Sequence, residues 1–262
     1  MKQRFYVGTS WKMNKTAAEA EKYVLELKRW LPVTPHCQVF IAAPFTAWWK
    51  AVEAVQGSSI MVGAQNMHWA DEGPFTGEVS PRMLNETGVH LVELAHSERR
   101  AYYNETDQDV NKKVKAALAH GLIPLVCIGE RQSDKNFGVS ADFLAIQVRI
   151  ALHGLTLSQA ERVWIAYEPV WAIGVGGTPA EPSYADVMQA HIRNVLLDLF
   201  GPDSGLHIPI LYGGSVSQEN AAELACQPNI DGLFIGRAGL QVETFLEIIS
   251  RVSSTLEQEY SR

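Results

Sequence analysis

Residues 90–130 read HLVELAHSERRAYYNETDQDVNKKVKAALAHGLIPLVCIGE and contain one complete repeat of the pattern that decides the fold. Residues 90–94 and 123–128 are β-rich, largely apolar runs without clean polar alternation, which predicts buried strands. Between them, apolar residues recur at steps typical of the buried face of a helix, at Val110, Val114, Ala117 and Leu118. A strand, a helix and a second strand in this order predict two parallel strands joined by a right-handed crossover.

The same alternation runs along the whole chain. The β-rich runs lie at residues 5–7, 38–42, 60–62, 90–94, 123–128, 163–167, 208–212 and 233–235. Helical periodicity marks residues 17–31 and two later sets of apolar positions, Phe143, Ile146, Ile150 and Val187, Ile192, Val195, Leu199. Eight such units in about 250 residues match a closed (β/α)8 barrel, the TIM barrel, better than a doubly wound sheet. No linker divides the chain, so we expect residues 1–262 to form a single α/β domain. Residues 64–85 are the exception, an irregular stretch where a helix would be expected, and loops of this length usually serve function or partner binding.

The composition excludes several classes of protein. The chain has 22 Lys and Arg against 29 Asp and Glu, a net charge of -7 and no basic block, which argues against binding to nucleic acid or to an anionic membrane. No apolar stretch approaches the roughly 20 residues that cross a bilayer, and the N-terminus lacks the apolar region of a signal peptide. We therefore expect a cytoplasmic protein, in which Cys37, Cys127 and Cys226 are reduced core thiols rather than disulfide partners or zinc ligands.

Polar residues follow the predicted strands at their carboxyl ends, where barrels carry their active sites. Lys12, His96 and Glu168 follow the first, fourth and sixth strands. A carboxylate can act as a general base, a histidine can polarise a carbonyl, and a lysine can stabilise developing negative charge. The glycine-rich ends of the last two strands supply backbone N–H groups, which often bind phosphate in barrels. Together these residues predict proton abstraction beside the carbonyl of a phosphorylated substrate, without a metal or a cofactor.

Several longer motifs appear in order: W-K-M-N, A-Q-N, F-T-G-E, H-S-E-R-R, C-I-G-E, Y-E-P-V-W-A-I-G and Y-G-G-S-V. On these motifs the chain resembles the triosephosphate isomerase family from end to end. The resemblance implies an isomerase that works through an enediolate, with Glu168 as base, His96 as electrophile, Lys12 as electrostatic partner and Glu98 as support. It also implies the remaining parts of the site, namely a mobile lid at residues 169–177, phosphate-binding N–H groups at Gly174, Ser215 and Gly236, and a homodimer in which Thr76 enters the partner's site.

The chain departs from the family pattern at a few positions. Ser10 stands where the family has Asn, and Arg237 stands where it has the second residue of a Gly-Gly pair. Ala95 replaces a Gly, Val175 replaces a Thr in the lid, and residues 67–71 are an unusual stretch. We expect Arg237 either to supplement the phosphate site or to point into solvent.

The combination of G-T-S-W-K-M-N, Q-N-M-H-W-A-D and F-I-G-R resembles a subgroup that isomerises L-erythrulose 1-phosphate to D-erythrulose 4-phosphate in erythritol breakdown. That substrate is dihydroxyacetone phosphate with one more hydroxymethyl group, for which space at Ser10 would provide room. Two alternatives stay open. One is a triosephosphate isomerase that interconverts dihydroxyacetone phosphate and D-glyceraldehyde 3-phosphate in glycolysis and gluconeogenesis, and the other is a non-catalytic barrel that binds sugar phosphates.

Overall fold

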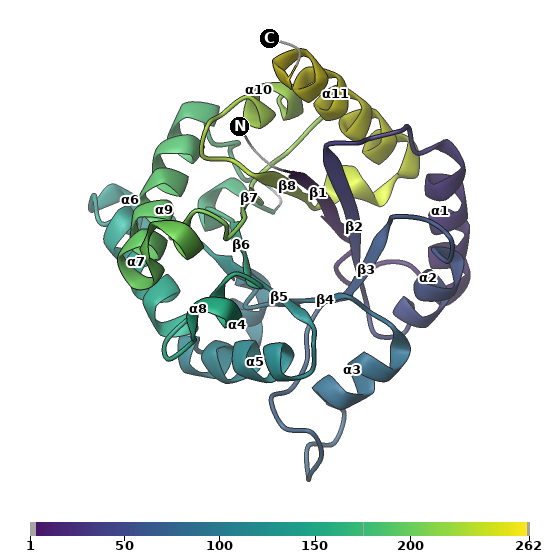
Figure 1. Cartoon of the computed structure of the whole chain (residues 1–262), viewed down its shortest axis with the longest axis horizontal. Coiled ribbons are helices and arrows are strands. Elements are labelled where there is room, and N and C mark those ends of the chain that lie inside the picture. The colour runs from purple at the N-terminus through teal and green to yellow at the C-terminus, as the bar shows by residue number, and fades with distance from the viewer. Residues whose placement is uncertain (1–3, 175, 261–262) are drawn as a thin grey trace.

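The computed structural model describes residues 4–174 and 176–260 and contains a closed barrel of eight parallel strands surrounded by helices (Figure 1). The strands follow one another around the barrel in chain order, and β1 pairs with both β2 and β8. The fold class predicted from the sequence, a (β/α)8 barrel, is therefore confirmed.

All eight predicted strands are present, and their ends differ from the prediction by three residues or fewer. The strands are β1 (Phe5–Ser10), β2 (Cys37–Ala43), β3 (Met61–Ala64), β4 (Leu91–Leu94), β5 (Ile123–Ile128), β6 (Trp164–Tyr167), β7 (Ile210–Tyr212) and β8 (Gly232–Ile235). The α-helices are α1 (Ala17–Trp30), α2 (Trp48–Ala54), α3 (Pro81–Thr87), α4 (Ser97–Tyr103), α5 (Asp107–Ala119), α6 (Gln132–Asn136), α7 (Ser140–Ala151), α8 (Leu157–Ala160), α9 (Pro182–Gly205), α10 (Ala221–Ala225) and α11 (Val242–Tyr260), and two short 3-10 helices are η1 (Val170–Ala172) and η2 (Arg237–Leu240).

The prediction of an irregular stretch after β3 is only partly correct, because helix α3 occupies its end. Ser80 caps this helix by accepting a hydrogen bond from the backbone N–H of Met83, and Pro81 occupies a first-turn position where its missing N–H has no consequence. The residues between β3 and α3 do form a long loop, which projects from the barrel in Figure 1.

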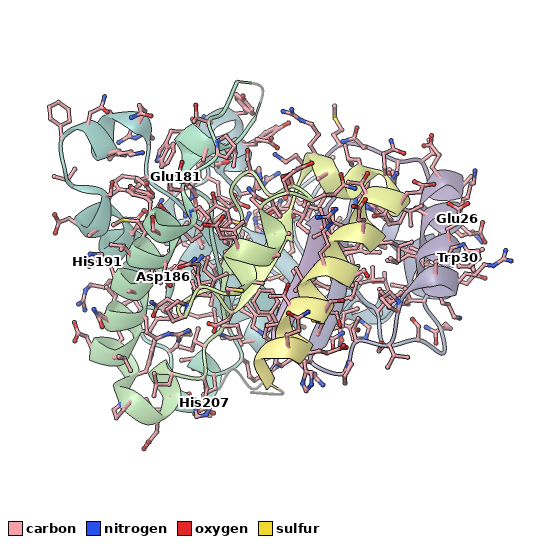
Figure 2. The ribbon with its side chains drawn as sticks, turned by 90° about the horizontal axis from the view of Figure 1, so that it is seen from above. Glu26, Trp30, Glu181, Asp186, His191 and His207 are labelled. Carbon is pink, nitrogen blue, oxygen red and sulfur yellow. The ribbon has the colours of Figure 1, made fainter. Side chains whose placement is uncertain are left out.

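The outer helices form one layer around the strands, as the view from above in Figure 2 shows for α1, α11 and α9. The inward faces that we predicted for α7 and α9 are partly wrong. Ile146 is 54% exposed and Val187 is 50% exposed, whereas Ile192 and Val195 are buried as expected. Both helices have apolar residues on more than one side, so periodicity alone did not identify the side that faces the strands. Among the described residues, no helix is long and apolar enough to cross a membrane.

The prediction of three core thiols holds for only part of the cysteines. Cys127 on β5 is buried inside the barrel, Cys37 is partly buried, and Cys226 is exposed. Cys226 directly follows the short helix α10, on the outside of the barrel.

The barrel interior positions the functional site. Its apolar filling comes from alternate residues of the strands, among them Phe40, Leu91, Leu125, Trp164, Leu211 and Phe234. Because side chains alternate across a strand, the inward position that follows Leu91 is Glu93, and the one that follows Leu125 is Cys127. On β1 the same alternation brings Ser10 inward at the carboxyl end. The uppermost interior layer is therefore polar. Its Ser10 lines a cavity at the carboxyl-terminal end of the barrel, and we call this side of the cavity its floor.

Candidate active site

A cavity of about 480 Å³ opens at the carboxyl-terminal end of the barrel. It is lined by eight of the predicted site residues, which are Ser10, Lys12, His96, Glu168, Gly174, Ser215, Gly236 and Arg237. They follow five different strands, so the barrel brings together residues that are far apart in the sequence.

Glu168 follows β6 and is 3% exposed. Its Oε1 lies 3.6 Å from the Cys127 thiol, and burial together with the negative charge of Glu168 raises the pKa of that thiol well above its usual value. Its Oε2 lies 3.6 Å from His96 Nε2 and accepts no hydrogen bond from the described residues. Gly213 leaves the room for this carboxylate, because a Cβ there would lie 2.6 Å from Glu168 Cγ. A buried oxygen without a donor is available to take up a proton.

His96 lies between β4 and α4, where it caps the helix. Its Nδ1 accepts a hydrogen bond of 3.2 Å from the backbone N–H of Glu98, so the proton of the neutral imidazole belongs on Nε2. The Nε2–H group is on the side of the ring that approaches Glu168. Ala95, the departure from the family's Gly, has a φ of 66°, a left-handed conformation that is strained for residues other than glycine.

Lys12 also has left-handed backbone, with a φ of 51°, and its Nζ donates to Glu98 Oε1 at 2.7 Å. Burial lowers the pKa of Lys12, but the hydrogen bond and charge of Glu98, together with the charges of Glu168 and Glu93, outweigh burial and raise it. The amine therefore stays protonated. Gly236 lies beside it, since a Cβ at that position would be 3.8 Å from Lys12 Cε. Lys12 thus lies beside both Glu98 and Gly236, at the carboxyl ends of different strands.

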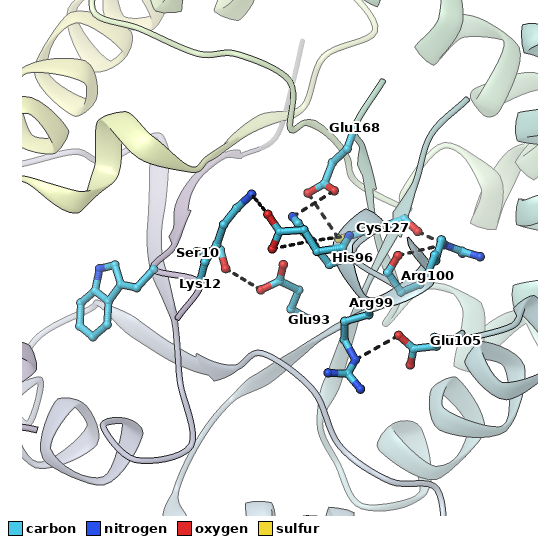
Figure 3. Close-up of polar contacts among 12 residues, drawn as sticks. Ser10, Lys12, Glu93, His96, Arg99, Arg100, Glu105, Cys127 and Glu168 are labelled. Carbon is cyan, nitrogen blue, oxygen red and sulfur yellow. Dashed lines mark hydrogen bonds and ion pairs between the residues drawn. The ribbon is translucent and has the colours of Figure 1, made fainter. Parts of the chain in front are cut away.

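Glu93, which the sequence analysis missed, belongs to the same cluster (Figure 3). Its side chain is 2% exposed and its Oε2 accepts a hydrogen bond of 2.8 Å from the Ser10 hydroxyl. Burial raises its pKa to about 7, with the charge of Glu168 adding to the effect and His96, Ser10 and Lys12 opposing it. The sequence feature that could have revealed Glu93 is a carboxylate within an otherwise apolar predicted strand.

Glu93, His96 and Glu168 each bring one potential metal-ligand atom to within 4.8 Å of the others. The backbone N–H of Glu98 already occupies the lone pair of His96 Nδ1, and Nε2 then carries the proton. A protonated nitrogen is a donor rather than a ligand, so this trio suits proton transfer better than metal coordination.

The opposite end of the cavity connects to the lid. Ser215 Oγ donates to the carbonyl of Ala172 at 2.6 Å, and Arg237 Nη2 donates to the carbonyl of Gly174 at 2.8 Å. Arg237 is exposed, yet it lines the cavity and bonds the lid instead of extending freely into solvent. Of the predicted lid, residues 169–177, Val175 lies outside the described residues.

The base of the lid is held by Glu130, the last residue of the C-I-G-E motif. Its buried Oε1 accepts hydrogen bonds from Trp171 Nε1 at 2.8 Å, Tyr184 OH at 3.0 Å and Tyr167 OH at 3.1 Å. Trp171 also lies under the ammonium group of Lys135, at 3.4 Å from its ring centroid. These contacts fix the segment that immediately follows Glu168.

Two of the predicted site residues do not line this cavity: Glu98 contacts the lining residues Lys12 and His96, whereas Thr76 lies elsewhere. Thr76 lines a separate surface cavity of about 430 Å³, together with Trp69, Phe75 and Tyr103. Phe75 is 40% exposed and Tyr103 is 67% exposed, so this face of the long loop presents apolar surface.

The fold and this cavity define a (β/α)8-barrel isomerase with a buried carboxylate, a histidine and a lysine at the carboxyl ends of its strands. The family model described as triosephosphate isomerase matches residues 5–252, and the chain belongs to the triosephosphate isomerase family. The L-erythrulose-1-phosphate isomerase of Rhizobium rhizogenes is 49% identical over 255 residues, 97% of this chain and 96% of that protein.

Two further relatives are nearly as similar to this chain. The L-erythrulose-1-phosphate isomerase of Brucella abortus is 47% identical over 256 residues, 97% of this chain and 98% of that protein. The triosephosphate isomerase of Carboxydothermus hydrogenoformans is 47% identical over 249 residues, 95% of this chain and 98% of that protein. Overall identity therefore separates the two kinds of relative only slightly.

Proposed function

We propose that this protein is a cofactor-free sugar-phosphate isomerase that converts L-erythrulose 1-phosphate to D-erythrulose 4-phosphate, as a step of erythritol breakdown. The convergence of Glu168, His96 and Lys12 in one cavity carries the isomerase part of the proposal. The relatives named L-erythrulose-1-phosphate isomerase support the four-carbon substrate, and so does Ser10 in place of a larger amide.

Glu168 is the base in this proposal. The substrate's C3 proton is acidic because it lies beside the C2 carbonyl, and the unpartnered Oε2 of Glu168 takes it up. The resulting enediolate is reprotonated at C2, which moves the carbonyl to C3 and gives the 4-phosphate product. The hydroxyl proton that must pass from O3 to O2 is assigned to His96, whose Nε2–H approaches the same space.

The negative charge that develops on the substrate oxygen needs donors that are already in place. The Nε2–H of the buried His96 and the protonated amine of the partly buried Lys12 supply them. Glu98 supports both residues, since its backbone N–H fixes the histidine and its carboxylate fixes the lysine. The phosphate is placed at the other end, against Gly174, Ser215, Gly236 and the guanidinium of Arg237.

The second candidate, a triosephosphate isomerase, is favoured by the relative of that name at 47% identity. Both candidates use the same chemistry and differ in one hydroxymethyl group. The remote alternative is a barrel that binds sugar phosphates without catalysis. It does not account for Glu168 Oε2, a buried carboxylate oxygen that accepts no hydrogen bond from the described residues.

One experiment separates these readings. The protein is incubated in heavy water with L-erythrulose 1-phosphate or with dihydroxyacetone phosphate, and deuterium uptake is followed by NMR. We expect uptake and product with both substrates and a higher kcat/KM with the tetrulose. Faster turnover of the triose would establish the second candidate, and no exchange with either would leave only the binding barrel. The Glu168→Gln variant serves as the background control.

We also propose that the protein is a homodimer in which Thr76 reaches the partner's cavity. The segments that follow β1, β2, β3 and β4 all leave the same rim of the barrel, and they present exposed apolar side chains at Met13, Phe45 and Phe75 in the loops and at Tyr103 at the end of α4. A surface of this kind favours association. Closure of the barrel supports a single domain over residues 1–262, and the low number of cysteines supports a cytoplasmic location.

A further inference from the structure

We propose that Ser10 and Glu93 together form a specificity site, in which Ser10 binds the terminal hydroxyl of the four-carbon substrate and Glu93 positions Ser10. This inference rests on the proposed function and assigns residues to the one group by which the two candidate substrates differ. Three observations support it: the position of the Ser10–Glu93 pair (the dyad) relative to the cavity, the direction of the hydrogen bond between the two side chains, and the burial of both.

The placement follows from the two ends of the cavity. In the proposed function the phosphate lies at Ser215 and Arg237, and the reacting carbons lie against the neighbouring Glu168 Oε2 and His96 Nε2 atoms, which are 3.6 Å apart. In L-erythrulose 1-phosphate the extra hydroxymethyl group is attached to C3, on the side away from the phosphate. It therefore extends beyond the base and the histidine, toward the floor of the cavity, where Ser10 is among the lining residues and its hydrogen-bond partner Glu93 is not.

The direction of the hydrogen bond gives Ser10 a defined role. The Ser10 hydroxyl donates its proton to Glu93 Oε2 at 2.8 Å. Toward the cavity, the Ser10 oxygen can therefore only accept a hydrogen bond. The terminal hydroxyl of the substrate is a donor and fits this acceptor. A triose phosphate has no group at this place, and binding it leaves Ser10 unpaired on the side of the cavity.

Glu93 acts through Ser10 rather than on the substrate. It is 2% exposed, and the groups around it are Ser10, His96, Glu168, Lys12 and the thiol of Cys127. A serine hydroxyl rotates freely unless a strong acceptor fixes it, and a buried carboxyl on a rigid strand does so. Glu93 is thus a positioning residue, and its effect on the substrate passes through the orientation of one hydroxyl.

The test compares substrate preference, defined as kcat/KM for L-erythrulose 1-phosphate divided by kcat/KM for dihydroxyacetone phosphate. In Ser10→Ala and in Glu93→Leu we expect this ratio to fall roughly tenfold to hundredfold, because the terminal hydroxyl loses its partner. In Glu93→Gln the amide oxygen still accepts from Ser10, and we expect the ratio to stay within about threefold of wild type. Rescue by Gln but not by Leu is a result that a purely structural role would not produce.

Thr9→Val is the matched control. Thr9 is the neighbour of Ser10 on β1, but it faces out of the barrel toward Gly239, and its hydroxyl has no hydrogen-bond partner among the described residues. This change alters the same strand without touching the dyad, so we expect an unchanged ratio. Unfolding curves of all variants show which of them are folded, and Ser10→Ala, the smallest change, provides the test if Glu93→Leu is not.

The outcomes separate this inference from the proposed function. A wild-type enzyme that is active on the tetrulose, with variants that lose both substrates in parallel, would overturn the role of the dyad and leave the function intact. A wild-type enzyme that turns over only the triose would refute the four-carbon function itself, and the specificity site with it.

Discussion

The two ends of the cavity are built in different ways. At the carbon end the chemistry depends on buried side chains, with Glu93 at 2%, Glu168 at 3% and His96 at 7% exposure. At the phosphate end the available groups are backbone N–H groups, a serine that bonds the lid and one exposed arginine. Buried charges need specific partners, whereas a charge that stays in water does not.

This difference explains how a chain with a net charge of -7 can bind an anion. In the proposed function the phosphate meets local donors, and the overall charge matters little at that distance because salt screens it. It also predicts that substitutions reduce activity strongly at the carbon end and weakly at the phosphate end. Substitutions at the two ends of the cavity measure that gradient.

The largest effect is expected for Glu168→Gln. The amide keeps the shape of the side chain but cannot take up a proton, so deuterium exchange should fall by about 10²–10⁴-fold. Binding of inorganic phosphate, measured by calorimetry, should change little because the phosphate end is intact. Exchange close to the wild-type rate would show that another group is the base, and loss of phosphate binding would show that the two ends are not independent.

A somewhat smaller effect is expected for Lys12→Met, which retains an unbranched side chain without the charge. Removing one donor that stabilises developing charge typically lowers kcat by about 10²–10³-fold. Because Lys12 also lies beside Gly236 at the phosphate end, we expect KM to rise as well, unlike in Glu168→Gln. A change in KM alone would mean that Lys12 binds the phosphate and takes no part in the chemical step.

The burial of the carbon end can be measured through Glu93, whose pKa is raised from 4.5 to about 7. Below pH 4.5 both the folded and the unfolded protein carry this proton, and the folded state has its full stability. As the pH rises toward 7, the unfolded state releases the proton first and stability is lost, by about 3 kcal/mol for this one group.

Glu93→Gln cannot release a proton and serves as the reference for this measurement. The free energy of unfolding of wild type, relative to this variant, should therefore fall by about 3 kcal/mol between about pH 4.5 and pH 8 in urea titrations. Other titrating groups are common to both proteins and cancel to first order. A constant difference across this range would mean that Glu93 has an ordinary pKa and that the floor of the cavity is wet.

The rim and the floor of the site also differ in how far they could be predicted from the sequence. The eight strands were found because buried parallel strands are apolar on both faces. Lys12, His96 and Glu168 were singled out because each lies within a few residues of the carboxyl end of such a strand. Residues at strand ends need no knowledge of register, since every carboxyl end meets the same rim. The rim of the site was therefore accessible from the sequence.

The floor of the site was not accessible in this way. Glu93 and Cys127 lie within strands, and whether they face the interior or the helices depends on register, which only the inward neighbours Leu91 and Leu125 reveal. The expectation that Ser10 opens space was incomplete for the same reason, because its hydroxyl is already bonded to a residue on another strand. The prediction of the buried helix face was wrong at residues such as Ile146, because apolar residues occur on two sides of that helix.

The smallest effect is expected at the phosphate end, for Arg237→Gly. The exposed guanidinium bonds one lid carbonyl and faces a solvated anion, and contacts of this kind contribute about 0.2–1 kcal/mol, so KM should rise by no more than about fivefold. Because the phosphate is common to both candidate substrates, kcat/KM should fall equally for the tetrulose and the triose, and the loss should shrink at high salt. Kinetics with both substrates at two ionic strengths check this. A change in substrate preference would mean that Arg237 senses the carbon end through the lid, and would contradict the separation of the two ends.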